Sequence, residues 1–261
     1  MEEGSTMSFL QHLEELRWRL VRSVVVILIL AIVIWWNQTW IMDHIFISMS
    51  KPEFFTFDFF CHYLNFMCIE EIPVNFQSTT VGGQFSYALW MSILGGFVVG
   101  FPYVFYQLWS FVKPGLKEKE KEMVKGIVFY VSLLFFLGIL FGYFVVAPMS
   151  VQFFGTYNIS PEIQNNFTIS SYMSTILSTV LYSGLFFLLP VVAYIMGKIG
   201  LISSGFLKKY RKHAIVGVLI LSAIITPPDM VSQIIVSIPI LALYEIGILV
   251  VKQVERKRAK E

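Results

Sequence analysis

The fold of this chain is decided by the apolar run VVVILILAIVIWW, residues 24–36. This run lies inside a longer segment, residues 23–42, that contains no Asp, Glu, Lys or Arg. At about 1.5 Å of rise per residue, a helix of that length crosses a hydrocarbon core of roughly 30 Å. The run therefore predicts a membrane-spanning helix over about residues 22–42.

The composition of all 261 residues agrees with a membrane protein. Hydrophobic residues make up 56% and charged residues 14% of the chain, whereas an average soluble domain has roughly 45–50% and about 25%. An ordinary soluble domain and a disordered chain are both excluded on this ground. The net charge of +2 gives no reason to expect a nucleic-acid partner.

Further charge-free stretches follow, at 72–112, 126–161, 163–197, 213–228 and 230–244. They predict an all-α polytopic membrane protein, one domain over residues 1–261, whose six transmembrane helices span about 22–42, 85–106, 125–147, 171–197, 213–228 and 232–250. A soluble helical core would account for the short stretches but not for the long ones. The last two helices are short, so we expect local thinning of the bilayer or shelter by neighbouring helices around them.

The basic residues predict the orientation. Eighteen of the 19 Lys and Arg residues lie on one side of the predicted helices, and Lys51 alone lies on the other. Because cytoplasmic segments are enriched in Lys and Arg, both termini are predicted in the cytoplasm. The first helix ends in a Trp cluster without a small-residue cleavage site, so we expect it to remain uncleaved.

The segment 43–84 is the largest loop on the predicted outer side, and it is rich in aromatic residues. We expect it to pack as a cap over the helices or to rest at the membrane interface. Both cysteines, Cys61 and Cys68, lie in this loop. An intraloop disulfide and two free thiols are equally open, and a zinc site with His44 and His62 is less favoured because two more ligands would be needed.

No motif points to an enzyme or to a cofactor. The chain contains no nucleotide-binding P-loop, no HExxH and no GxSxG motif. His12 and Glu15 share a helix face, but two ligands do not make a metal site. We therefore predict no catalytic residue, no metal and no cofactor.

Two acids lie at predicted membrane depth. Asp229 follows Thr226-Pro227-Pro228 at the outer end of the fifth helix, where an N-cap for the sixth helix is the favoured structural interpretation. Glu245 lies well inside the sixth helix, where an ionisable group costs about 3 kcal/mol and is a functional candidate. Gln233 lies about three and a third turns away, about 120° around the helix from Glu245, and together they could line one broad polar stripe.

Two more groups of charges lie on the predicted cytoplasmic side. Residues 14–20, EELRWRL, form an amphipathic lead-in to the first helix, and residues 117–122, KEKEKE, alternate in sign. Alternating charges are typical of a solvated surface, so composition alone selects none of these carboxylates.

Four motifs in order resemble the TatC family, the multispanning core subunit of the twin-arginine protein translocase. They are HLEELRWRL at 12–20, YQLWSFVKPGL at 106–116 with Glu120, FGYFVVAP at 141–148, and TPPD at 226–229 with Gln233 and YEIG at 244–247. The resemblance covers nearly the whole chain.

The resemblance implies a receptor for signal peptides that carry paired arginines. Glu15 and Glu120 would accept the two arginines, with Arg17, Phe111 and Pro114 shaping the surface around them. Guanidinium and carboxylate groups form charge-assisted, often bidentate hydrogen bonds, which suits this role. Glu245, Gln233 and Asp229 would be intramembrane polar or partner-contact residues.

The resemblance also implies partners and a location. Small single-helix proteins of the TatA and TatB type, twin-arginine signal peptides of folded precursors, and further copies of the chain would assemble with it in the bacterial inner membrane. Folded proteins would then be exported with the proton-motive force.

Three prolines and two departures from the family pattern bear on this resemblance. Pro102, Pro190 and Pro239 should bend their helices, which suits the concave bundle that the family implies. Many members carry Glu or Gln where this chain has Leu188, so that polar group is missing from the fourth helix, and the long loop with two cysteines is a second departure.

Two other function classes compete with this interpretation. A proton- or ion-coupled small-solute transporter could use Glu245 and Asp229, but it predicts inverted sequence repeats, which are not evident in the sequence. A membrane-embedded enzyme is less favoured still, because no pair of nucleophile and base stands out.

Overall fold

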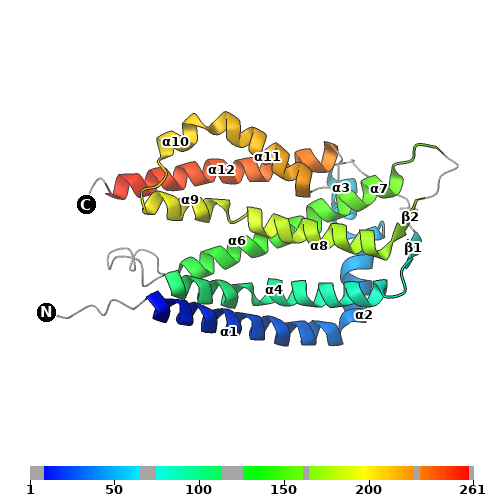
Figure 1. Ribbon diagram of the computed structural model, residues 1–261. Coiled ribbons are helices and arrows are strands. Elements are labelled where there is room, and N and C mark those ends of the chain that lie inside the picture. Colours follow the sequence, from blue (N-terminus) through cyan, green and yellow to red (C-terminus); the bar gives the residue numbers. More distant parts are fainter. Residues whose placement is uncertain (1–8, 65–74, 113–125, 161–164, 226–229, 259–261) are drawn as a thin grey trace. The chain divides into compact units, whose positions relative to one another are not determined.

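The computed structural model describes residues 9–64, 75–112, 126–160, 165–225 and 230–258. Its described part is almost entirely helical (Figure 1). Five of its helical stretches are long and apolar enough to cross a membrane: His12–Trp36, Gly83–Val112, Ile127–Thr156, Ile169–Lys198 and Gln233–Lys257. The predicted all-helical membrane class is therefore confirmed at this level.

The sixth predicted span is not among these five. The segment predicted over 213–228 corresponds to helix α11, Arg211–Ile225, which has 15 residues. At about 1.5 Å per residue α11 is roughly 22 Å long, short of a hydrocarbon core of roughly 30 Å. Residues 226–229 follow outside the described part, so the six-span topology stays a prediction.

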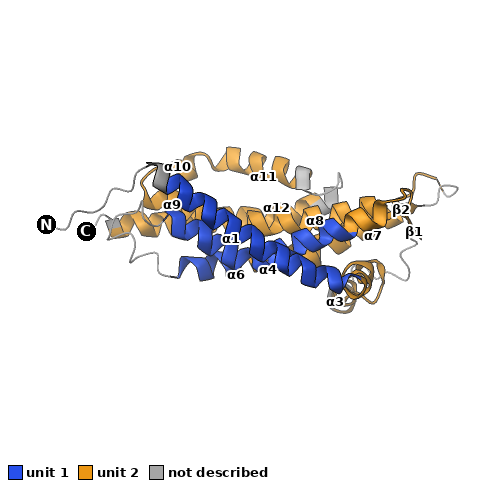
Figure 2. Ribbon diagram, turned by 60° about the horizontal axis from the view of Figure 1, so that its bottom comes forward, with its two compact units in different colours: residues 1–38, 88–132 blue, residues 39–87, 133–261 orange. Residues whose placement is uncertain are grey.

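The chain divides into two compact units, which Figure 2 shows in different colours. Unit 1 comprises residues 1–38 and 88–132, and unit 2 comprises residues 39–87 and 133–261. Unit 1 contains helix α1 (Phe9–Trp36), most of helix α4 (Gly83–Val112) and the start of helix α6 (Ile127–Phe141).

Within unit 1, α1 and α4 approach each other closely at a glycine. A Cβ atom built on Gly96 would lie 2.7 Å from the backbone oxygen of Ile27 and 2.9 Å from the backbone nitrogen of Ala31. No side chain fits between backbones at that distance. Small residues of this kind allow membrane helices to pack by van der Waals contact, where the hydrophobic effect contributes little. The contact fixes α1 against α4.

Unit 2 contains the remaining helices and two short strands. After α2 (Gln38–Ile41) come a π-helical turn η1 (Met42–Phe46), a 3₁₀ turn η2 (Ile47–Ser50) and α3 (Phe55–Leu64). The later elements are the rest of α6, η4 (Gly142–Val146), α7 (Ala147–Thr156), α8 (Ile169–Phe186), α9 (Leu189–Lys198), α10 (Ser204–Lys209), α11 and α12 (Met230–Arg258).

The two short strands were not predicted from the sequence. β1 (Asn75–Gln77) pairs in parallel with β2 (Asn166–Thr168), with Phe76 opposite Phe167. Each strand has only 3 residues, too few for alternation of polar and apolar residues to be recognised.

The proline at position 190 acts more strongly than the predicted bend. The fourth predicted helix, 171–197, is interrupted at 187–188, and α9 starts at Leu189 with Pro190 in its first turn (Figure 1). Pro190 has no N–H to donate to the carbonyl of Phe186, and it disfavours helical geometry in the residue before it. By contrast, Pro102 and Pro239 lie inside the continuous helices α4 and α12.

The described part of the loop 43–84 is fastened to the helices of unit 2. Pro148 has no N–H to donate to the carbonyl of Phe144, and the Thr56 hydroxyl donates to that carbonyl instead. The Tyr143 hydroxyl donates to the carbonyl of Ile45 at 2.9 Å, and the Tyr172 hydroxyl donates to that of Phe46 at 2.5 Å. Backbone carbonyls that the irregular turns leave open are thereby satisfied.

Apolar side chains complete the core of unit 2. Val146, Val218, Val236 and Ile240 are buried together. They bring η4, α11 and α12 into contact, and α9 also packs along α12.

Candidate functional site

The predicted arginine-binding residue Glu15 lies on α1 in unit 1, beside a groove. One of its carboxylate oxygens, Oε1, accepts hydrogen bonds from Nε of Arg19 at 3.1 Å and from Nη2 of Arg19 at 2.5 Å. Its other oxygen, Oε2, is buried and has no hydrogen-bond partner among the described residues. A buried acceptor without a donor is costly, so Glu15 is a half-satisfied carboxylate.

The groove beside Glu15 has a volume of about 570 Å³. Among the described residues, its α1 wall carries two acids and two arginines, and its α4 wall carries uncharged polar groups. The lining residues are Glu14, Glu15, Trp18, Arg19, Arg22, Tyr106, Gln107 and Ser110. The close contact of α1 with α4 holds these two walls together.

Two of the other predicted residues lie close to this groove. Phe111 stacks on the ring of His12, with the centroids 4.2 Å apart. Arg17 lies on the exposed side of α1, 3.8 Å from Glu14, with both side chains about two-thirds exposed. The Arg17–Glu14 pair therefore contributes little to stability.

The sequence interpretation missed several residues in or near the groove. It considered His12 as a metal ligand and rejected that role, whereas the ring packs on Phe111. It did not select Arg19, although the spacing of four residues from Glu15 is the spacing of a helical ion pair. Gln107, which is buried and donates to the Tyr103 hydroxyl at 2.7 Å, carried no signal beyond its place in a motif.

Four predicted residues lie outside the described part of the chain: Glu120, Pro114, Asp229 and Cys68. Their predicted roles stay predictions. Helix α12 begins at Met230, directly after Asp229. Cys61, on α3, takes part in a disulfide bond, and its pairing with Cys68 stays a prediction.

Glu245 on α12 has a partner that the sequence did not suggest. Nη2 of Arg211 lies 2.7 Å from its Oε2, and both side chains are about half exposed. The next residue, Tyr244, donates its hydroxyl to the carbonyl of Leu207 at 2.8 Å. Glu245 and Tyr244 therefore tie α12 to α10 and α11.

Gln233, the second member of the predicted stripe on α12, also contacts α11. Its Nε2 donates to the carbonyl of Leu219 at 3.1 Å. Glu245 and Gln233 are thus engaged within the chain and are not isolated polar groups facing lipid.

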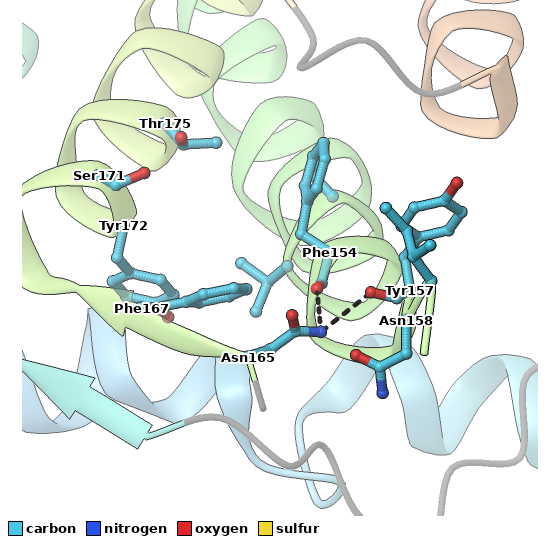
Figure 3. A pocket seen from close by; sticks show the side chains of 11 residues that line it. Phe154, Tyr157, Asn158, Asn165, Phe167, Ser171, Tyr172 and Thr175 are labelled. Atoms are coloured by element: carbon cyan, nitrogen blue, oxygen red, sulfur yellow. Dashed lines mark hydrogen bonds between the residues drawn. The ribbon is translucent and has the colours of Figure 1, made fainter. Parts of the chain in front are cut away.

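A second cavity, in unit 2, lies at the ends of α7 and α8 (Figure 3). It has a volume of about 330 Å³. Asn165 Nδ2 donates to the carbonyls of Phe154, Gly155 and Tyr157 at 3.1, 3.2 and 3.0 Å and so caps the C-terminal end of α7. The described lining residues carry aromatic rings, hydroxyls and amides, and none of them carries a carboxylate or a basic group.

Comparison with known proteins places the chain in a family. The family model described as "Sec-independent protein translocase protein (TatC)" matches residues 11–239. A TatC protein of Blattabacterium from Periplaneta americana is 38% identical over 98% of this chain and 99% of its own length. A TatC protein of Helicobacter pylori is 36% identical over 93% of this chain and 88% of its own.

A solved structure agrees with these relatives. The crystal structure titled "Twin Arginine Translocase Receptor- TatC" matches with a TM-score of 0.71 and 28% identity, over 94% of this chain and 99% of that one. This chain belongs to the TatC family and is a membrane component of the Sec-independent, twin-arginine protein translocase, a transport subunit and not an enzyme.

Proposed function

We propose that this chain is the signal-peptide receptor and channel-forming core of its translocase. It binds signal peptides with paired arginines at its cytoplasmic face, and folded precursors are exported with the proton-motive force. The observation that carries this proposal is the half-satisfied carboxylate of Glu15 beside the groove between α1 and α4.

The chemistry of Glu15 suits an arginine ligand. Its buried Oε2 is an acceptor without a donor in the described part of the chain, and a guanidinium offers five N–H donors in a fixed planar arrangement. A hydrogen bond between two charged groups is about twice as strong as one between neutral groups. Two arginines require two acceptors, and Glu120 is the second in this proposal, with Arg17, Phe111 and Pro114 shaping the surface.

Photo-crosslinking of a twin-arginine precursor tests this role. Glu15→Ala and Glu120→Ala should each abolish crosslinking to the chain in membranes, and export should stop with it. Glu53→Ala is the matched control, because Glu53 is an exposed acid on the predicted outer side. Unchanged crosslinking and export in both variants, at wild-type membrane levels, would contradict the assignment of Glu15 and Glu120 as the arginine-binding carboxylates.

Small single-helix proteins of the TatA and TatB type are the partners we propose, together with further copies of this chain. One face of α12 near Glu245 is exposed and apolar: Ile246 is 47% and Leu249 60% exposed, whereas the neighbouring Ile248 is 1% exposed. A single transmembrane helix with an apolar face would cover the exposed residues.

Disulfide crosslinking tests the α12 contact. Leu249→Cys should crosslink to a cysteine placed in a TatA- or TatB-type helix, and Ile248→Cys should not, because it faces the core of unit 2. A Leu249→Cys variant that reacts only with lipid-soluble reagents and with no partner helix would refute this contact.

The proposed location is the bacterial inner membrane, with six spans and both termini in the cytoplasm. The support is the distribution of the basic residues, of which only Lys51 lies on the predicted outer side.

A further inference from the structure

We infer that Arg19 is a specificity-determining residue of the signal-peptide site: by pairing with Glu15 it makes the groove select a guanidinium over an ammonium. This inference deepens the proposed function and rests on it. It starts from the two bonds that Arg19 makes to Oε1 and from the vacant bonding capacity of Oε2.

The geometry divides the Glu15 carboxylate into two different acceptors. Arg19 bonds through both Nε and Nη2 to the same oxygen, Oε1. An arginine that bound the carboxylate side-on in the usual bidentate way would use both oxygens. Here Oε2 is left over: it is buried, and the side chain that carries it lines the groove.

The pairing also changes the charge that a ligand meets. The side chains of Glu15 and Arg19 are 27% and 20% exposed, so the ion pair is partly shielded from water. Around them the groove carries Glu14 and Arg22 as well, and the formal charges of the lining residues that the structure describes cancel. A ligand cation therefore gains little from overall Coulomb attraction to this groove.

What remains to attract a ligand is directional hydrogen bonding. A guanidinium can donate to Oε2 and at the same time to a neutral acceptor such as the hydroxyl oxygen of Ser110 or Tyr106, because its donors lie in a plane at fixed angles. A lysine ammonium is a compact, strongly hydrated point charge, which depends more on net negative potential and loses more hydration on entry. By neutralising Glu15, Arg19 weakens the negative potential on which the binding of lysine depends more than the binding of arginine.

A merely structural role for Arg19 makes a different prediction. An i, i+4 ion pair braces a helix by about 0.2–0.5 kcal/mol. Loss of such a brace would weaken the binding of every peptide by the same factor, and it would leave the preference for arginine unchanged.

The test measures the binding of two synthetic signal peptides, one with paired arginines and one with paired lysines, to the purified full-length chain in lipid nanodiscs. Arg19→Gln should raise the affinity for the lysine peptide roughly three- to fivefold, the size expected of one partly exposed ion pair, and so reduce the preference for arginine. Arg19→Lys keeps the neutralising charge, so its preference should stay within about twofold of the wild type. Fluorescence anisotropy of labelled peptides gives both affinities.

Each outcome decides the inference. If the wild type prefers the arginine peptide and Arg19→Gln keeps the same preference, Arg19 does not determine specificity and the proposed function stands. If the wild type has no preference, the proposed function fails and this inference fails with it. If Arg19→Gln does not fold by circular dichroism, Arg19→Met, which also removes the charge, decides: a reduced preference for arginine supports the inference, and an unchanged preference overturns it.

Discussion

At the scale of single residues, two carboxylates of this chain are held by arginines with opposite results. Glu245 bonds Arg211 across two helices, and both side chains are about half exposed. Glu15 bonds Arg19 on its own helix, and its second oxygen is buried with no donor from any residue that the structure describes. The first pair joins helices, whereas the second leaves binding capacity for a ligand. The groups that surround each carboxylate, and not its residue type, therefore decide whether it joins helices or can bind a ligand.

The Glu245–Arg211 pair should contribute modestly to stability. Because both groups are about half exposed, solvent screens their attraction, and we expect a coupling energy of about 0.2–1 kcal/mol. A double-mutant cycle of Arg211→Gln and Glu245→Gln, read by unfolding in detergent micelles, measures it. A coupling above about 2 kcal/mol would mean that the pair is effectively buried.

Removal of the Tyr172 hydroxyl should destabilise the protein by more than the net contribution of one ordinary hydrogen bond. It is buried and donates to the carbonyl of Phe46, so Tyr172→Phe leaves a carbonyl without a donor and should cost about 1–3 kcal/mol. Tyr182→Phe is the control on the same helix, since Tyr182 is 41% exposed. Equal unfolding midpoints for the two variants would contradict the stabilising role of the hydrogen bond from Tyr172 to Phe46 of the outer loop.

At the scale of elements, the contact between α1 and α4 depends on Gly96. Even a methyl group there would meet the backbone of Ile27 and Ala31, which cannot give way as a side chain can. The groove beside Glu15 lies between the same two helices, so its width depends on this contact.

Gly96→Ala should therefore lower stability by about 1–3 kcal/mol, as overpacking does. Gly217→Ala is the matched control: a Cβ atom on Gly217 meets nothing within 4 Å, and alanine favours a helix by about 1 kcal/mol over glycine. Thermal unfolding midpoints of the two variants should shift in opposite directions. A Gly96→Ala protein as stable as the wild type would refute the tight packing.

The sequence predicted elements well where one physical signal dominated. Long apolar runs identified the five long spans, and Pro190 marked the right place for a disturbance in the fourth. The interruption at 187–188 could not be foreseen, because it depends on whether neighbouring helices compensate the lost bond. Arg211 and Glu245 lie 34 residues apart, and only the packing of α11 on α12 brings them together. Glu15 was identified by its motif, and its second oxygen by the structure alone.

At the scale of the whole molecule, the short helix α11 decides the topology. If α11 crosses the membrane, the chain has six spans and its C-terminal end lies with the N-terminus in the cytoplasm. If α11 does not cross, five spans place the C-terminal end outside. The basic residues that follow Val251 favour the cytoplasmic side.

Labelling of intact cells with a membrane-impermeant maleimide distinguishes the two topologies. Lys257→Cys should react only after the cells are permeabilised, whereas Val81→Cys, which is fully exposed in the described structure, should react in intact cells. Both variants are made with Cys61 and Cys68 replaced by serine. Labelling of Lys257→Cys in intact cells would establish five spans.

The most direct test of the central claim, that Glu15 receives a signal-peptide arginine, is equilibrium binding of a twin-arginine peptide to the wild-type chain and to Glu15→Gln. The wild type should bind this peptide roughly ten- to a hundredfold more tightly than Glu15→Gln, the size of a hydrogen bond to a charged group. Equal affinities of the two folded proteins for the peptide would contradict the claim.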